Sequence, residues 1–395
     1  MTSPGVPRVL ILSAGMGAGH DGVAAELARR LAARGVVTDT ADVLDLLPLR
    51  LGAALRRGYR WAVGNAPWLY ELVYRVFFVS RHPPPASPLT LVVAARLERL
   101  VRRARPAAVV STFHVAAQAA GHLRAKGRLG APSVVVVTDF AAHRLWLHPG
   151  NDAYLCSDEA TAAYVAEATG RPARPHAPLV RPEFAAARRA ASGSREHGRR
   201  VIISAGSWGV GRVEEAARVL AATGRYVPVV LCGGNERLRR RLRSAVGPGL
   251  ALGWRDDVPG LLASAYALVD NAAGLTCKEA FAAGVPVISY RPIPGHGRDG
   301  ALAMARAGLG RYARGPAELV EALDELGELG ELDRPGGLNG LDALGELDRP
   351  GGLDRLDGWR GGPGATGRAA LLARADALFL APQAEDLLPL GPGTA

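Results

Sequence analysis

Cysteine is scarce in this 395-residue chain: the three present, Cys156, Cys232 and Cys277, lie far apart and form no C-x-x-C pair. This spacing argues against a disulfide framework and against a cysteine zinc site, and it favours a reduced, cytosolic setting. Long hydrophobic runs are missing too, since no stretch reaches the roughly 18 uninterrupted apolar residues that span a bilayer. No charged segment precedes the short apolar run near the N-terminus, so neither an export signal nor a membrane span is expected.

Lysine is nearly absent: the chain has 46 arginines and only two lysines, Lys126 and Lys278. With abundant alanine and glycine, this ratio is typical of a coding bias, so surface arginine alone is weak evidence of function. The net charge of +11 is nevertheless uneven: residues 1–190 hold 24 Arg and Lys against 13 Asp and Glu, and the remainder is balanced. A basic front half predicts an anionic partner, such as a lipid surface or a phosphorylated substrate. No nucleic-acid module accompanies it, so nucleic acid is not an expected partner.

The chain does contain short apolar runs that alternate regularly with helical patterns. Short β-rich runs alternate with helical patterns from "RVLILS" to "SVVVVTDF", and again from "RRVIISAGSWG" to "VPVISY". This alternation predicts an α/β fold with two doubly wound, Rossmann-like domains. Ligands bind beyond the carboxyl ends of the strands in such sheets, so two facing domains are expected to enclose a cleft.

Breaks in this alternation predict the boundaries. The front domain is expected at residues 1–185 and the rear domain at 195–320, joined by the proline-rich stretch 171–184. The sequence "GELDRPGGL" occurs twice within residues 324–362, which predicts a flexible acidic insertion. A helical pattern within residues 366–385 is expected to pack back on the domains.

Residues 49–82 mix aromatic side chains with arginines. An anionic bilayer interface attracts this combination, which predicts peripheral binding to the inner face of the cell membrane. An ordinary pair of amphipathic helices packed on its own domain is the alternative. The aromatic members are Trp61, Trp68, Tyr70, Tyr74, Phe77 and Phe78.

The loop "SAGMGAGH" follows the first predicted strand. Gly15, Gly17 and Gly19 would let backbone amides approach an anion at a helix N-terminus. The loop lacks the G-K-[ST] of a Walker motif, and His20 stands where a dinucleotide fingerprint has its third glycine. An imidazole there can accept a proton near neutral pH, so His20 is either a general base or merely a cap of the turn.

The rear half contains "NAAGLTCKEA", which places Gly274 and Thr276 at the start of a helix and Glu279 about one turn later. Backbone amides at such a site can hold a diphosphate, and an inward carboxylate can accept hydrogen bonds from two ribose hydroxyls. Glu279 as a simple partner of the helix dipole is the alternative. A second loop of small residues, with Gly206 and Ser207, follows the strand "RVIIS".

Four motifs together, "SAGMGAGH", "VVTDFAAHRLWLHPGNDAYLCSDEA", "LCGGNERL" and "GLTCKEAFAAGVPVISYRPIPG", resemble the monogalactosyldiacylglycerol synthase and processive diacylglycerol glucosyltransferase group. They are also similar to the peptidoglycan lipid-linked N-acetylglucosamine transferase. The resemblance spans about residues 8–312. It implies a GT-B architecture, in which the front domain binds a lipid acceptor and the rear domain a UDP-sugar.

The resemblance also implies roles for individual residues. His20 would be the general base, with Asp139 as its orienting group or as an alternative base. Trp146 and His148 would lie at the acceptor side together with Gly17 and Gly19, although His148 as a fixed core histidine is an alternative. The donor would be bound by Gly206, Ser207, Asn235, Gly253, Trp254, Gly274, Thr276, Glu279 and His296.

The sequence departs from the family's pattern after "RPIPG". The family usually has glutamine, glutamate and asparagine facing the sugar there, whereas this chain has His296, Gly297 and Gly300. His296 with Asp299 are candidate replacements for these polar groups.

The predicted function is an inverting transfer of a hexose from a UDP-sugar to a lipid such as diacylglycerol. No D-x-D motif stands at a strand end, so no metal or other cofactor is expected, and helix N-termini and arginines would stabilise the departing diphosphate. Two alternatives remain at this point: a natural-product glycosyltransferase or UDP-sugar epimerase of similar fold, and a non-catalytic UDP-sugar-binding protein.

Overall fold

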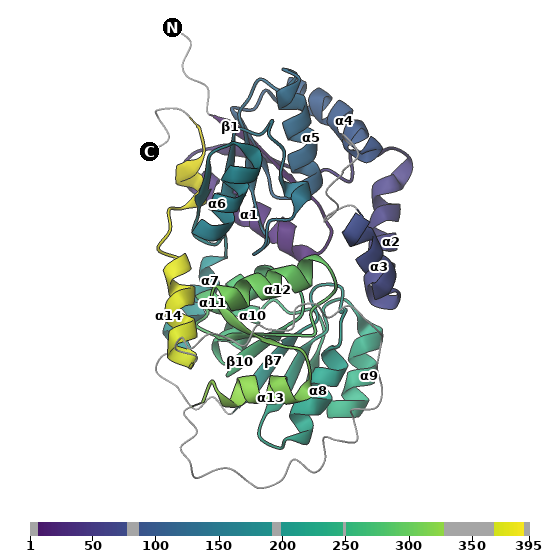
Figure 1. Cartoon of the computed structure of the whole chain (residues 1–395), viewed down its shortest axis with the longest axis vertical. Helices are drawn as coiled ribbons and strands as arrows, with labels where there is room; N and C mark the ends of the chain where they lie inside the picture. Colours follow the sequence, from purple (N-terminus) through teal and green to yellow (C-terminus); the bar gives the residue numbers. More distant parts are fainter. Residues whose placement is uncertain (1–6, 77–86, 192–198, 248–249, 328–366, 391–395) are drawn as a thin grey trace.

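The computed structural model describes residues 7–76, 87–191, 199–247, 250–327 and 367–390 (Figure 1). Two six-stranded sheets form its framework, each with its strands paired in parallel. The first has the order β2-β1-β3-β4-β5-β6, and the second has the order β12-β11-β10-β7-β8-β9. The predicted pair of doubly wound domains is confirmed.

The first sheet consists of β1 (Arg8–Ser13), β2 (Val37–Asp42), β3 (Ala108–Ser111), β4 (Ser133–Val136), β5 (Ala153–Cys156) and β6 (Ala173–Pro175). The second consists of β7 (Arg200–Ser204), β8 (Val227–Leu231), β9 (Ala251–Leu252), β10 (Ala267–Asp270), β11 (Val287–Tyr290) and β12 (Gly310–Ala313). Their central strands are almost continuous apolar runs because helices cover both faces of each sheet.

Helices of the front half are α1 (Ala18–Ala33), α2 (Leu51–Asn65), α3 (Pro67–Tyr74), α4 (Pro88–Ala104), α5 (His114–Ala125) and α6 (Glu159–Thr169). Those of the rear half are α7 (Pro182–Ala191), α8 (Val213–Ala222), α9 (Glu236–Val246), α10 (Val258–Ala263), α11 (Leu275–Ala282), α12 (His296–Arg306) and α13 (Pro316–Asp324). No helix within the described ranges is long and apolar enough to cross a bilayer.

The proline-rich stretch 171–184, predicted as the connection between the domains, contains regular structure. Residues 173–175 form β6, an edge strand, where a missing N–H is tolerated. Pro182 is the first residue of α7, a position whose N–H has no partner within the helix. The side chains of Val180 and Phe184 already pack in a core of the second domain.

The C-terminal segment contacts both domains. Helix α14 (Arg368–Leu378) packs on α11, and Arg188 of α7 pairs with Asp376 at 2.5 Å. Beyond it, Asp386 pairs with Arg34 at the end of α1, also at 2.5 Å. Figure 1 shows this yellow segment running along one side of the molecule past both sheets. Most of the predicted acidic insertion, residues 328–362, lies outside the described residues.

Candidate active site

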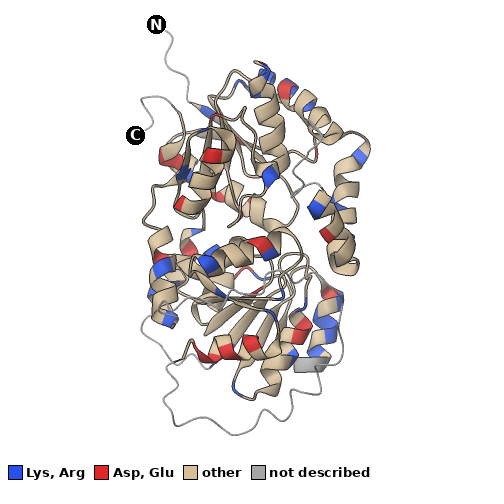
Figure 2. Ribbon diagram, in the orientation of Figure 1, with Lys and Arg blue, Asp and Glu red and all other residues tan. Residues whose placement is uncertain are grey.

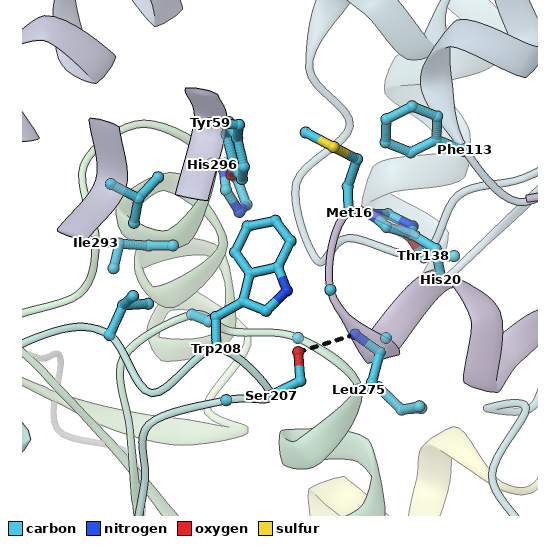
Figure 3. Close-up of a pocket in the computed structure, with 18 of the residues that line it drawn as sticks. Met16, His20, Tyr59, Phe113, Thr138, Ser207, Trp208, Leu275, Ile293 and His296 are labelled. Carbon is cyan, nitrogen blue, oxygen red and sulfur yellow. Dashed lines mark hydrogen bonds between the residues drawn. The ribbon is translucent and has the colours of Figure 1, made fainter. Parts of the chain in front are cut away.

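A cavity of about 1200 Å³ lies between the two domains, where the loops after β1, β4, β7 and β10 meet. These loops follow the carboxyl ends of parallel strands, which is where doubly wound sheets bind ligands. Helices α2 and α3 form a further wall. Figure 3 shows the centre of this cavity, with Trp208 and Ser207 of the rear domain opposite His20 and Met16 of the front domain.

His20 lies in the first turn of α1 and lines the cavity. Its Nδ1 is 2.9 Å from the carbonyl oxygen of Thr112 and 3.1 Å from Thr138 Oγ1. A carbonyl oxygen can only accept, so Nδ1 carries the proton and donates it. Nε2 therefore holds the lone pair that a general base needs. The ring packs edge-on against Phe113, with centroids 5.0 Å apart.

The glycine loop before α1 is folded by contacts within the protein. Gly17 has φ of 112°, a backbone conformation that favours glycine, and it turns the chain into the helix. The amide of Gly15 donates to Asp42 Oδ2 at 2.8 Å, and the amide of Ala18 donates to Ser207 Oγ at 3.2 Å. Two amides of the predicted anion cradle thus have protein acceptors, so in this arrangement the loop supports the position of His20.

Asp139 also lines the cavity, and its carboxylate contacts Trp146 and His143. Its Oδ2 accepts a hydrogen bond from Trp146 Nε1 at 2.9 Å and lies 3.6 Å from His143 Nε2. His20 Nδ1 is oriented instead by the carbonyl oxygen of Thr112, which accepts its hydrogen bond, and by the nearby hydroxyl of Thr138.

Trp146 and His148 are not among the residues lining the cavity. The Trp146 side chain is fully buried, where it holds Asp139. His148 Nδ1 accepts from the amide of Gly150, and a side chain at Gly121 would collide with the imidazole. The alternative of a fixed core histidine fits His148 better than an acceptor contact does.

Two further histidines, His114 and His143, line the cavity beside His20, and sequence reasoning missed both. Their rings are 5.1 Å apart, and the His114 ring lies 4.1 Å from that of Phe113. Burial lowers the pKa of His114 to about 3 and also lowers that of His143, so both are neutral at pH 7. Their positions in the sequence could have predicted them as cavity residues, because His114 follows β3 and His143 follows β4 at the carboxyl edge of the sheet.

On the rear domain, the N-terminus of α11 faces the cavity. Gly274 is its N-cap residue, and no side-chain hydrogen bond caps the helix, which leaves its first amides for a ligand. Thr276 and Glu279 also line the cavity. Burial raises the pKa of Glu279 to about 7, and the positive charge of Arg181 opposes this shift.

The remaining predicted donor residues divide into two groups. Gly206, Ser207, Gly253 and Trp254 line the cavity, and Trp254 is 64% exposed. Asn235 does not line it. Its Oδ1 caps α9 by accepting from the amide of Leu238, and its Nδ2 donates to the carbonyl oxygen of Gly209. Asn235 therefore supports the loop after β7.

His296 begins α12 and lines the cavity, and its Nδ1 is 2.6 Å from the hydroxyl oxygen of Tyr70 on α3. Burial lowers the pKa of His296 and raises that of Tyr70, so a neutral phenol and a neutral imidazole share this hydrogen bond. Neighbouring atoms leave little room for a side chain at Gly297 and Gly300, which follow His296. A Cβ at Gly297 would lie 2.5 Å from Ile293, and one at Gly300 would lie 3.0 Å from Ala273.

Three more cavity residues escaped the sequence analysis: Tyr59, Trp208 and Lys278. The rings of Tyr59 and Trp208 meet edge to face at 5.5 Å, which joins α2 to the loop after β7 (Figure 3). Tyr59 and Trp208 belong to different domains and are far apart in the sequence, so no local sequence pattern predicts their contact.

Two facing Rossmann-like domains with a cleft between them are the GT-B fold. The structure resembles the crystal structure of MurG from Acinetobacter baumannii, with a TM-score of 0.55, 14% identity and coverage of 95% of this chain and 96% of that one. It also resembles a UDP-glucosyltransferase from Polygonum tinctorium, with a TM-score of 0.53, 17% identity and coverage of 82% and 90%. The chain therefore has the GT-B fold.

Residues 20–172 match the family described as monogalactosyldiacylglycerol (MGDG) synthase. The chain is also 27% identical over 350 residues to the processive diacylglycerol beta-glucosyltransferase of Bacillus cereus, covering 81% of this chain and 85% of the relative. The enzyme of the same name from Bacillus thuringiensis is 26% identical over 351 residues, with the same coverage. The resemblance predicted from the motifs is confirmed, and the chain is a hexosyltransferase homologous to this group.

Proposed function

We propose that this protein transfers a hexose from a UDP-sugar to the hydroxyl of a diacylglycerol-type lipid, with inversion at the anomeric carbon. One observation carries the proposal: His20, with Nε2 as the basic nitrogen, lines the same cavity as the uncapped N-terminus of α11. A base on one domain and a diphosphate site on the other are the two groups that glycosyl transfer requires. The proposal agrees with the activity for which the Bacillus relatives are named.

The front part of the cavity has the chemistry of a lipid site. Its walls there come from α2, α3, α4 and α5 and are largely apolar. Such a wall suits acyl chains, because apolar surface gains free energy when it leaves water. The apolar lining residues include Leu44, Leu51, Ala54, Leu55, Leu69, Leu89 and Val115.

In the proposed reaction, His20 Nε2 takes the proton of the acceptor hydroxyl as its oxygen attacks the anomeric carbon. The bond from that carbon to the diphosphate oxygen breaks, and UDP leaves with the electron pair on the opposite face. The first amides of α11 and its helix dipole stabilise the departing charge, with Arg181 nearby at the cavity wall. Glu279, when ionised, accepts hydrogen bonds from the ribose hydroxyls.

We propose that the surface formed by η1 (Pro48–Arg50), α2 and α3 contacts an anionic membrane, at the inner face of the cell membrane. Leu49 is 98% exposed, Trp68 70% and Trp61 56%, and each is a large apolar side chain. Figure 2 shows basic residues along the same helices. Exposed aromatics beside basic residues favour an anionic lipid interface. Phe77 and Phe78 of the predicted segment lie outside the described residues.

The direct experiment supplies the enzyme with a panel of UDP-sugars and vesicles containing diacylglycerol, and measures both released UDP and glycosylated lipid. We expect UDP and glycolipid to form in equal amounts with at least one donor. Transfer only to small soluble aglycones, conversion of the donor to its epimer, or donor binding without turnover would each contradict the proposal and favour the corresponding alternative function.

A further inference from the structure

Lys278 is one of only two lysines in a chain with 46 arginines, and it is buried in the contact between the domains. It lies on α11 of the rear domain, and its Nζ donates to the carbonyl oxygen of Thr138 in the front domain at 2.7 Å. The ammonium also lies 5.0 Å from the centre of the Phe140 ring. A guanidinium is wider and planar, whereas an ammonium is a compact charge, which suits so enclosed a site.

Thr138 connects this ammonium to the base. It follows β4, and its hydroxyl oxygen is 3.1 Å from His20 Nδ1. Lys278 therefore holds the backbone of the residue whose side chain contacts the imidazole. The link runs from α11 through Thr138 to α1, and it crosses the cleft.

Two other contacts join the first turn of α1 to the rear domain. The amide of Ala18 donates to Ser207 Oγ of the rear domain at 3.2 Å. Leu275, the first residue of α11, packs so closely on α1 that a Cβ at Gly22 would lie 2.6 Å from its Cδ2. Separation of the domains would break all of these contacts, so the position of His20 depends on the closed arrangement.

We propose that Lys278 is a positioning residue, through which the donor-binding helix sets the geometry of His20 by way of Thr138. This inference rests on the proposed function of His20 as the base. Thr276 and Glu279 of the same helix line the donor side of the cavity. In this proposal one helix, α11, both binds the nucleotide and positions the base. His20 is then correctly placed to remove the acceptor proton only when the donor is bound and the domains are closed.

The test compares Lys278→Met with Lys126→Met, a matched change at the other lysine, which is exposed at the end of α5. Methionine fills the length of the lysine side chain without its charge or its hydrogen bond. We expect kcat for transfer to fall on the order of 10-fold or more in Lys278→Met, since small displacements of a catalytic group are costly. The KM for the UDP-sugar should change less than threefold, and Lys126→Met should match the wild type.

A second variant keeps the test independent of how Lys278→Met folds. Thr138→Val removes the hydroxyl that contacts His20 and leaves the carbonyl that Lys278 binds, and it should also lower kcat. In the double variant the two losses should not multiply, because both substitutions act on one link. A kcat for Lys278→Met or Thr138→Val equal to that of the wild type, or losses that multiply in full, would overturn the inference. An inactive wild type would instead refute the proposed function.

Discussion

At the scale of single residues, burial determines the charge of most groups around the reaction centre. Burial keeps His114 and His143 neutral, and it brings the pKa of Glu279 to about 7 and that of Lys278 to about 8. Asp139 and Asp158 favour the charged form of Lys278 and oppose part of the shift. The cavity thus combines neutral imidazoles with two groups that titrate near neutral pH.

The raised pKa of Glu279 gives a testable dependence on pH. If its carboxylate accepts hydrogen bonds from the ribose, affinity for the donor should rise as pH increases through about 7, because the folded protein loses that proton there. UDP-glucose is the suitable probe, since its diphosphate does not titrate in this range. Calorimetry from pH 6 to 8 should show this rise in the wild type and not in Glu279→Gln. An equal rise in both proteins would contradict the role.

Residue type and place were sufficient to predict His20 and Glu279 as cavity residues, because both follow glycines at the carboxyl end of a strand. Their partners could not be predicted. Thr112 and Thr138 are 92 and 118 positions from His20, and Lys278 is 140 positions from Thr138. Only the packing of the two domains brings these atoms together. Asp139 was predicted as a partner of His20. It lines the same cavity, but its carboxylate accepts a hydrogen bond from Trp146.

At the scale of elements, α3 is the helix that joins the proposed membrane surface to the rear domain. Trp68 is exposed on it, whereas Tyr74 is buried and donates to Asp299 of α12 at 2.9 Å. Glu71 pairs with Arg298 of α12 at 3.2 Å. Helix α3 thus packs on the rear domain and still exposes apolar side chains, and its contact with a membrane stays a prediction.

Gly295 allows this docking, and its substitution tests it. It has φ of 73°, and a Cβ there would lie 2.6 Å from the Tyr74 ring. Gly224→Ala is the control for a positive φ without a close neighbour, with φ of 64° and no atom within 4 Å. The control should lose about 1–2 kcal/mol of unfolding free energy from its backbone alone. Gly295→Ala should lose about 1–3 kcal/mol more because of overpacking, as measured by urea denaturation. Equal losses would show that α3 does not dock there.

The membrane surface on α2 and α3 makes a separate prediction. The affinity of the double variant Trp61→Ser, Trp68→Ser for anionic vesicles should be lower by at least about tenfold, because two large apolar side chains no longer enter the interface. Trp254→Ser is the control, since that tryptophan is equally exposed but lies on the rear domain. Vesicle sedimentation at low and high salt measures the effect. A loss in the control as large as in the double variant would locate the contact elsewhere.

At the scale of the whole molecule, the fold was predictable and the arrangement of its parts was not. Alternating apolar runs and helical patterns predicted two parallel sheets, since each strand buried on both faces must be uniformly apolar. The sequence predicted that the C-terminal segment packs back on the domains. It did not indicate that α7 would pack on the rear domain, or that α1 is the element that residues 384–388 contact. Those contacts depend on surface shape and on single pairs such as Arg34 with Asp386.

The central claim is that the two domains bring one imidazole to an acceptor hydroxyl while the rear domain holds the donor. Transfer of labelled hexose from a UDP-sugar to diacylglycerol by His20→Gln tests it most directly. The variant should bind the donor as the wild type does and transfer sugar about 10²- to 10⁴-fold more slowly. Transfer by His20→Gln at the rate of the wild type would contradict the claim.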